Sequence, residues 1–113
     1  MNTLKTLQEV CSAVGVTRRA VQGYEEAGLV SAIDRNKYGY LLYGENEEKR
    51  IAKIKLFQEF RFTLKEIKGL IDAPNEVVKA ALEKQLNKLY AEKDRLDALI
   101  AEAKAMIVKL SEE

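Results

Sequence analysis

The side chains best suited to binding chemistry lie close together near the N-terminus, at Thr17, Arg18, Arg19, Gln22 and Tyr24. An arginine can take guanine through two hydrogen bonds or hold a phosphate, and a glutamine can read adenine. Gln22 stands one helical turn beyond the two arginines. The Thr17 hydroxyl, the backbone amides of a helix start and the Tyr24 hydroxyl can all contact phosphate. The spacing therefore predicts a short helix that presents its first turns to a DNA duplex.

A second polar group follows at residues 35–43 and mixes basic with aromatic side chains. The members that we expect to contact phosphate or the minor groove are Arg35, Lys37, Tyr38, Tyr40 and Tyr43. Residues 49–68 hold seven basic and two acidic side chains, and Arg61 is among the basic ones. Because the whole chain has a net charge of only +1, nucleic-acid binding must depend on these local patches.

Other chemistries are excluded by composition. The 113 residues contain no His and one Cys, so side-chain clusters for zinc, iron–sulfur or haem, an internal disulfide and His-dependent catalysis are ruled out. No nucleophile–base pair or phosphate loop is visible, so we expect neither an enzyme nor a cofactor. The chain has no 18-residue apolar run and no signal pattern, which predicts a cytoplasmic protein without membrane contact. Cys11 lies on an apolar helix stripe and is expected in the core.

Two short helices joined by a tight turn are expected before residue 28. Thr6 and Glu9 have the spacing of a capping box, which opens a helix that Gly15 can end. Thr17 can cap the next helix, and Gly28 ends it. Two capped helices across so short a turn predict a helix-turn-helix unit.

A β-hairpin and two further helices are expected next. β-Branched and aromatic residues predict strands near 32–34 and 40–43, with the turn at Asn36. So short a hairpin must pack on the helices as a wing. After Gly44, acidic residues precede basic ones, as suits a helix dipole. Thr63 and Glu66 form a second capping box. The only proline, Pro74, marks the boundary between predicted domains 1–73 and 74–113.

One long helix is expected over residues 76–111. Its apolar seam alternates spacings of four and three residues, and Lys93 is the one polar member. The seam consists of Leu82, Leu86, Leu89, Lys93, Leu96, Ile100, Ala103, Ile107 and Leu110. The chain has no second long helix to cover this seam, so we predict a homodimeric coiled coil. Lys93 either extends its charged end to solvent or fixes the register of the pairing.

Together these segments resemble the MerR family of transcriptional regulators. The motifs that carry the resemblance are Gly15-Val16-Thr17, Tyr24-Glu25-Glu26-Ala27-Gly28-Leu29, Gly39-Tyr40 with Tyr43, and Phe62-Thr63-Leu64-Lys65-Glu66-Ile67. The resemblance implies a mainly α fold, in which a winged helix-turn-helix domain is followed by a helix that pairs antiparallel in the dimer. It also implies a homodimer on a pseudo-palindromic promoter element, with DNA distortion that lets RNA polymerase engage. A bacterial, nucleoid-associated location follows from the same resemblance.

The sequence departs from the family pattern at several positions. Gln22-Gly23 stand where Arg-Tyr is common, Leu41 and Leu42 replace two wing arginines, and Arg61 replaces the usual Gly. These changes predict altered or weaker operator contacts. The resemblance implies cysteines near the end of the long helix in metal and redox sensors, and this helix has none. It implies a further C-terminal domain in drug sensors, so we expect no small-molecule effector within these 113 residues. The sequence fits an effector-less regulator, an N-terminal fragment of a longer protein, or a regulator controlled by a protein partner that docks on the coiled coil.

Two other functions fit the same features. The first is an architectural DNA-binding protein without promoter specificity. The second is a coiled-coil adaptor whose N-terminal module binds protein instead of DNA. The operator, the target genes and the choice between activation and repression are not encoded in any motif.

Overall fold

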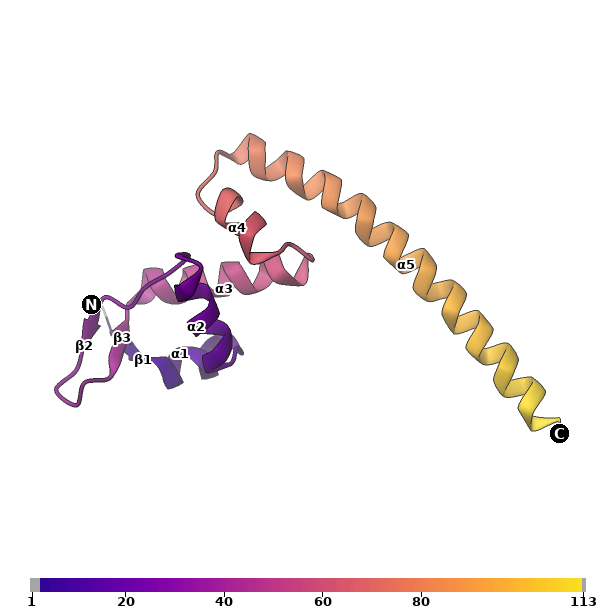
Figure 1. Cartoon of the computed structure of the whole chain (residues 1–113), viewed down its shortest axis with the longest axis horizontal. Helices are drawn as coiled ribbons and strands as arrows, with labels where there is room; N and C mark the ends of the chain where they lie inside the picture. The colour runs from indigo at the N-terminus through magenta and orange to yellow at the C-terminus, as the bar shows by residue number, and fades with distance from the viewer. Residues whose placement is uncertain (1–2, 113) are drawn as a thin grey trace. The chain divides into compact units, whose positions relative to one another are not determined.

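The computed structural model describes residues 3–112, and Figure 1 labels its elements. In chain order these are β1 (Lys5–Thr6), α1 (Leu7–Val14), α2 (Arg18–Glu26), β2 (Asp34–Arg35), β3 (Leu41–Tyr43), α3 (Glu45–Glu59), α4 (Leu64–Leu70) and α5 (Asn75–Ser111). The chain divides into two compact units, Met1–Pro74 and Asn75–Glu113. The predicted mainly α fold, with a small hairpin and a long C-terminal helix, is confirmed.

The sheet has three strands instead of the predicted two. Its order is β1-β3-β2 and both pairings are antiparallel. Lys5 pairs with Tyr43, and Asp34 pairs with Leu42. The prediction placed the first hairpin strand at 32–34, but the ladder of β2 begins only at Asp34. It missed β1 because two residues that run directly into a helix cap leave no alternating pattern to detect.

The predicted caps of the first two helices are present. The Thr6 side chain accepts a hydrogen bond from the Glu9 amide, and the Glu9 carboxylate accepts one from the Thr6 amide. These bonds from Thr6 hold the pKa of the Glu9 carboxyl below its usual value. Thr17 caps α2 by accepting from the Ala20 amide at 3.0 Å. Gly15, at φ 81°, ends α1 in the left-handed conformation.

α2 and α3 end in the same Schellman motif, but with different residues at the left-handed position. After α2, Gly28 has φ 75°, and the Leu29 amide donates back to the Tyr24 carbonyl at 2.9 Å. After α3, Arg61 has φ 77°, and the Phe62 amide donates back to the Phe57 carbonyl at 3.2 Å. Glycine adopts this conformation freely, whereas arginine pays a steric penalty.

The core of the N-terminal unit lies between α1, α2, α3 and the sheet, with α4 packed on α3. The residues with no exposed surface are Val10, Val21, Ile51, Ile54 and Ile67. They come from four helices, so the unit closes its own core. Cys11 is half-buried, and burial raises the pKa of its thiol.

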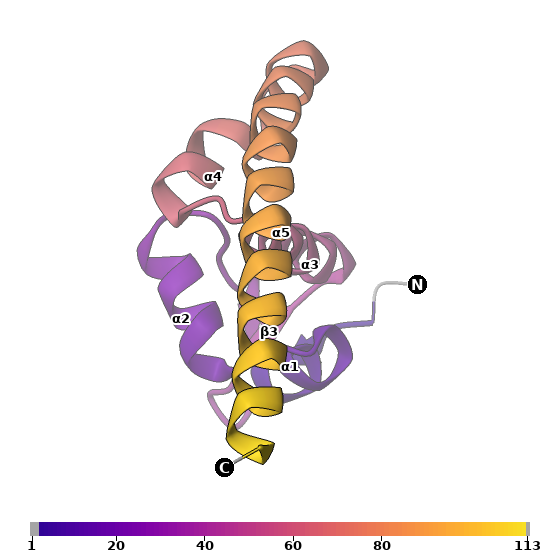
Figure 2. The ribbon, with the colours of Figure 1, turned by 90° about the vertical axis from the view of Figure 1, so that its right-hand side faces the viewer.

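α5 is one uninterrupted helix of 37 residues (Figure 2). Ten of its large apolar side chains are exposed by 48% or more, namely Val77, Leu86, Tyr90, Leu96, Leu99, Ile100, Met106, Ile107, Val108 and Leu110. Over residues 3–112, no helix combines the length and the apolar character that crossing a bilayer requires. The second unit thus differs from the first in leaving most of the large apolar side chains of its helix exposed in the single chain.

Candidate nucleic-acid interface

A cleft of about 570 Å³ lies where the starts of α1 and α2 meet the hairpin. Its lining residues are Thr6, Leu7, Gln8, Arg18, Arg35, Gly39, Tyr40 and Leu41. Arg18 comes from the first residue of α2, whereas Arg35 and Tyr40 come from the hairpin. The fold therefore brings together two groups of predicted DNA-contacting residues that are separated in the sequence, and it places two guanidinium groups on one hollow.

Both arginines of this cleft are exposed and make hydrogen bonds within the protein. Arg35 Nη1 donates to the Gly39 carbonyl at 2.8 Å, across the hairpin turn. Arg18 Nη2 lies 3.5 Å from the Gln8 side-chain oxygen. A guanidinium carries five N–H donors, so each arginine keeps donors for an anion such as a phosphate.

The first turns of α2 present the remaining residues of the predicted reading face. Thr17, Arg19 and Gln22 are all exposed. The Thr17 oxygen accepts the capping bond from Ala20, which leaves its hydroxyl proton free to donate. Gly23 follows in the same helix, and a Cβ added there would meet nothing within 4 Å. The surface beside Gln22 therefore has space at the position where the resemblance implies a tyrosine.

The tip of the hairpin carries an exposed aromatic pair. Tyr38 is 71% exposed and Tyr40 is 64% exposed, with their ring centroids 6.5 Å apart. The Lys37 ammonium lies 5.1 Å from the Tyr38 ring centre. The Asn36 side chain accepts hydrogen bonds from the amides of Tyr38 and Tyr40, which fixes the turn. Two phenol hydroxyls and one ammonium are thus available at the tip for phosphate.

Tyr24 and Tyr43 are core residues, which corrects the expectation that their hydroxyls face DNA. Tyr24 is 2% exposed, and its hydroxyl donates to Gln58 at 2.6 Å. Tyr43 is 1% exposed, and its hydroxyl donates to Glu25. Burial raises the pKa of both phenols, and the hydrogen bond to Glu25 raises that of Tyr43 further. Both side chains point inward because burying the large apolar ring gains more free energy than exposing the single hydroxyl, which finds a hydrogen-bond partner in the core.

Arg61 does not line the cleft. It is exposed at the end of α3, where its guanidinium donates to the Glu59 carbonyl at 3.2 Å. The sequence could not separate this position from the rest of the basic stretch. Its positive φ is a geometry that glycine adopts freely, and glycine is the residue that the resemblance implies at this position.

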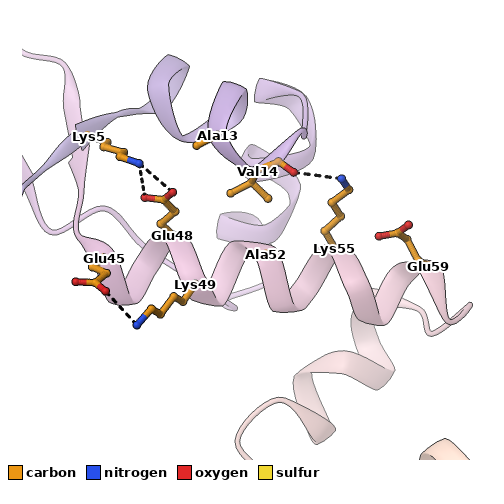
Figure 3. A pocket seen from close by; sticks show the side chains of 9 residues that line it. All are labelled: Lys5, Ala13, Val14, Glu45, Glu48, Lys49, Ala52, Lys55 and Glu59. Atoms are coloured by element: carbon orange, nitrogen blue, oxygen red, sulfur yellow. Dashed lines mark hydrogen bonds and ion pairs between the residues drawn. The ribbon is translucent and has the colours of Figure 1, made fainter.

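A second groove lies between α1 and α3 and is drawn in Figure 3. Its basic residues have protein partners: Lys5 lies 2.9 Å from Glu48, Lys49 lies 3.0 Å from Glu45, and Lys55 donates to the Val14 carbonyl at 3.2 Å. Three glutamates and three lysines balance around it. The predicted basic stretch 49–68 is therefore partly structural, and this groove has no excess positive charge for a polyanion.

The structure also exposes apolar residues of α5 that the predicted seam omits. Leu99 and Met106 each precede a seam residue, Ile100 and Ile107 respectively, so they widen the apolar face of the last four turns. A search for a strict a/d repeat misses such flanking positions, whereas a helical projection of residues 96–110 detects them. Three apolar positions per heptad give a wider apolar face than the narrow seam of a strict a/d repeat.

Two capped helices across a tight turn, with a β-hairpin beside them, define a winged helix-turn-helix unit. The profile of the MerR HTH family regulatory proteins matches residues 5–74. The chain belongs to this family. The predicted membership is confirmed.

Individual relatives agree with this assignment. The HTH-type transcriptional activator mta of Bacillus subtilis is 34% identical over 94 residues, which cover 83% of this chain and 37% of that protein. A MerR-family regulator from Bacillus cereus matches with a TM-score of 0.84 and 26% identity, covering 98% of this chain and 85% of that one. HiNmlR matches with a TM-score of 0.70 and 16% identity, covering 87% and 79%, which shows a shared fold. The chain spans 37–44% of the length of mta and of the TipA activators.

Proposed function

We propose that this chain is a sequence-specific DNA-binding transcriptional regulator that acts as a homodimer on a pseudo-palindromic promoter element. The observation that carries the proposal is the cleft where Arg18 of α2 meets Arg35 and Tyr40 of the hairpin. One half of this surface suits base edges in the major groove, and the other suits the flanking backbone. Membership of a family of regulatory proteins supports the same function.

The proposed contacts divide into two kinds. Arg18, Arg19 and Gln22 lie at the start of the recognition helix, from which side chains reach base edges. Arg35, Lys37, Tyr38 and Tyr40 lie on the wing and are assigned to phosphate, with Thr17 as a further phosphate donor. Arg61 is a weaker candidate, since it lies outside the cleft lining. The wing has Leu41 and Leu42 in place of two further arginines, so it contributes fewer charges to affinity.

The homodimer is proposed from the exposed seam of α5. Leu86, Leu96 and Ile107 are exposed by 48–62% in the single chain. Burying an apolar side chain of this size contributes about 1.5–3 kcal/mol, so several along one seam offset the cost of association. We assign the interface to the nine predicted seam positions, with Leu99 and Met106 at its edge. Antiparallel pairing is the arrangement that the family implies.

Regulation by DNA distortion completes the proposal. Two reading heads at a fixed separation can bend or untwist the duplex between them, with the deformation energy supplied by backbone contacts. Such distortion would bring promoter elements into a register that RNA polymerase recognises. HiNmlR, whose fold this chain shares, is described as bound to promoter DNA. A cytoplasmic, nucleoid-associated location is part of the same proposal.

Selection of duplexes from a random pool tests this function. The full chain should enrich an inverted repeat whose half-sites fall in successive major grooves on one face of the duplex. An architectural protein would retain DNA without enriching a sequence, and an adaptor would retain none. Either of those results would replace the proposal by the corresponding alternative.

Arg19→Ala tests the base-reading assignment. We expect it to weaken binding to the selected duplex by about 1–3 kcal/mol, and to weaken binding to random duplex much less. Arg35→Ala is the matched variant, and we expect it to weaken both equally, because a phosphate contact carries no sequence information. Competition titrations measure both. An equal loss for Arg19→Ala on the two duplexes would reassign that residue to phosphate.

A further inference from the structure

Arg50 of α3 connects two segments that lie far from it in the sequence. Its Nε donates to the Leu29 carbonyl, at the end of the Schellman motif that terminates the recognition helix. Its two terminal nitrogens donate to the two carboxylate oxygens of Asp72, at 2.8 and 2.9 Å. One guanidinium therefore joins the end of the helix-turn-helix to the segment that leads into α5.

Asp72 lies in the short segment that connects α4 to α5. Asp72 follows α4 and precedes Asn75, the first residue of α5, by three positions. Lys53, one turn beyond Arg50 on the same helix, donates to the adjacent Ile71 carbonyl at 3.3 Å. The Ala73 amide donates to the Leu70 carbonyl at 3.0 Å. These four hydrogen bonds, together with the one from the Ile71 amide to the Ile67 carbonyl, fasten residues 71–73, which we call the joint.

The contact between Arg50 and Asp72 has a fixed relative orientation. A bidentate arginine–carboxylate contact fixes the plane of both groups, whereas a lysine at the same place would act as a point charge. Arg50 is one-third exposed and Asp72 is about three-quarters exposed, so the pair adds little to global stability. The hydrogen bonds from Arg50 lower the pKa of the Asp72 carboxyl, so the carboxylate keeps its charge to a lower pH than a free aspartate would. A contact of this kind restrains local geometry more than it stabilises the fold.

We propose that Arg50 is a positioning residue, which fixes the joint against the end of the recognition helix and so restricts the half-site separation that a dimer accepts. The inference rests on the proposed function, because half-site separation has meaning only for a DNA-binding dimer. A joint that is held at residue 72 limits how far the orientation of α5 can change relative to that of the recognition helix. A released joint tolerates a wider range of separations.

The test compares half-site separations with four proteins. The selected duplex is made with its original half-site separation and with one or two base pairs inserted or deleted. We expect the wild-type chain to prefer one separation by at least tenfold in Kd over its neighbours. Asp72→Asn should reduce that preference at least threefold while changing the thermal midpoint little. Asp72→Glu, which keeps a carboxylate, should retain it.

Glu45→Gln is the matched control, because it removes an exposed ion pair of the same helix α3 that ties no other segment. It should leave the preference unchanged. A full preference in Asp72→Asn, or an equal loss in Glu45→Gln, overturns the positioning role while the proposed function stands. A wild-type chain that binds duplex without any preferred separation also overturns it. Failure of the wild type to bind any duplex refutes the proposed function itself.

Hydrogen exchange gives a readout that does not need DNA. The Ala73 amide should exchange at least fivefold faster in Asp72→Asn than in the wild type, with core amides of α3 unaffected. Glu45→Gln should not change it. Equal protection in all three proteins would show that the pair does not hold the joint, whatever the result with DNA.

Discussion

The two units of this chain differ in how far they bury their apolar side chains. In residues 3–74, Val10, Val21, Ile51, Ile54 and Ile67 have no exposed surface. In α5, Ile100, Ile107 and Leu110 are exposed by 52–63%. The first unit closes its core within one chain, whereas the second leaves these side chains exposed, and we propose that a second copy of α5 covers them. A mutation in one unit should therefore change folding, and a mutation in the other should change assembly.

The largest expected effect comes from the seam. Leu89→Asp combined with Leu96→Asp places two charges on the proposed interface, where desolvating them costs several kcal/mol. We expect monomers at micromolar concentration and at least a hundredfold weaker binding to the selected duplex. Sedimentation velocity and titration measure the two effects.

A matched variant separates the interface from the helix itself. Ala91→Asp with Ala98→Asp introduces the same charges at the same spacing on the opposite side of α5, where both residues are exposed. It should remain dimeric. Retained dimers in the seam variant, or monomers in both, would contradict the seam assignment.

The next largest effect is expected in the core of the first unit. Ile51→Ala removes a fully buried side chain of α3 and should lower the free energy of unfolding of that unit by about 2–5 kcal/mol. Leu56→Ala, on the same helix but 47% exposed, should lower it much less. Urea denaturation followed by circular dichroism compares them. Similar losses at the two positions would mean that the core of the unit is not where we place it.

A smaller, stabilising effect is expected at Arg61. The left-handed conformation destabilises a non-glycine residue by about 1–2 kcal/mol, and glycine avoids this steric cost. Part of the gain is lost because glycine has more conformational freedom in the unfolded chain. Arg61→Gly should therefore stabilise the first unit by about 1 kcal/mol. Gly28→Ala places the opposite change in the equivalent motif of α2, and it should destabilise. A destabilised Arg61→Gly would show that the arginine side chain contributes more than its backbone costs.

The smallest effect is expected in the recognition helix. Gly23 lies inside α2, and a Cβ there meets no atom within 4 Å. Gly23→Ala should stabilise the first unit by about 0.5–1 kcal/mol, because glycine in a helix interior loses more conformational freedom on folding. Thermal unfolding measures the shift. An unchanged or lowered midpoint would indicate a contact at this surface that the free chain does not reveal.

The local signals in the sequence predicted the helices well. Thr6, Thr17 and Thr63 cap the helices where the spacing indicated, because a cap depends on residues within one turn. β1 was missed because its pairing with β3 is a long-range contact between very short strands. Its two residues carry no periodic pattern of their own.

The sequence predicted several residues of the candidate site, but it did not predict which of them lie together. Charge and helix position identified Arg18 and Arg35, yet only the fold places them on one cleft. Tyr24 and Tyr43 were misassigned, because a tyrosine in a half-polar segment gives no sign of which way its hydroxyl points. The contact of Arg50 with Asp72 joins residues 22 positions apart, and no local pattern announces it.

Sedimentation velocity of a labelled duplex carrying the selected inverted repeat, mixed with the full chain at low salt, addresses the central claim most directly. The account predicts one complex that contains two chains per duplex, with binding that weakens steeply as salt is raised. A complex of one chain per duplex, or a duplex that sediments unchanged at every protein concentration, would contradict it.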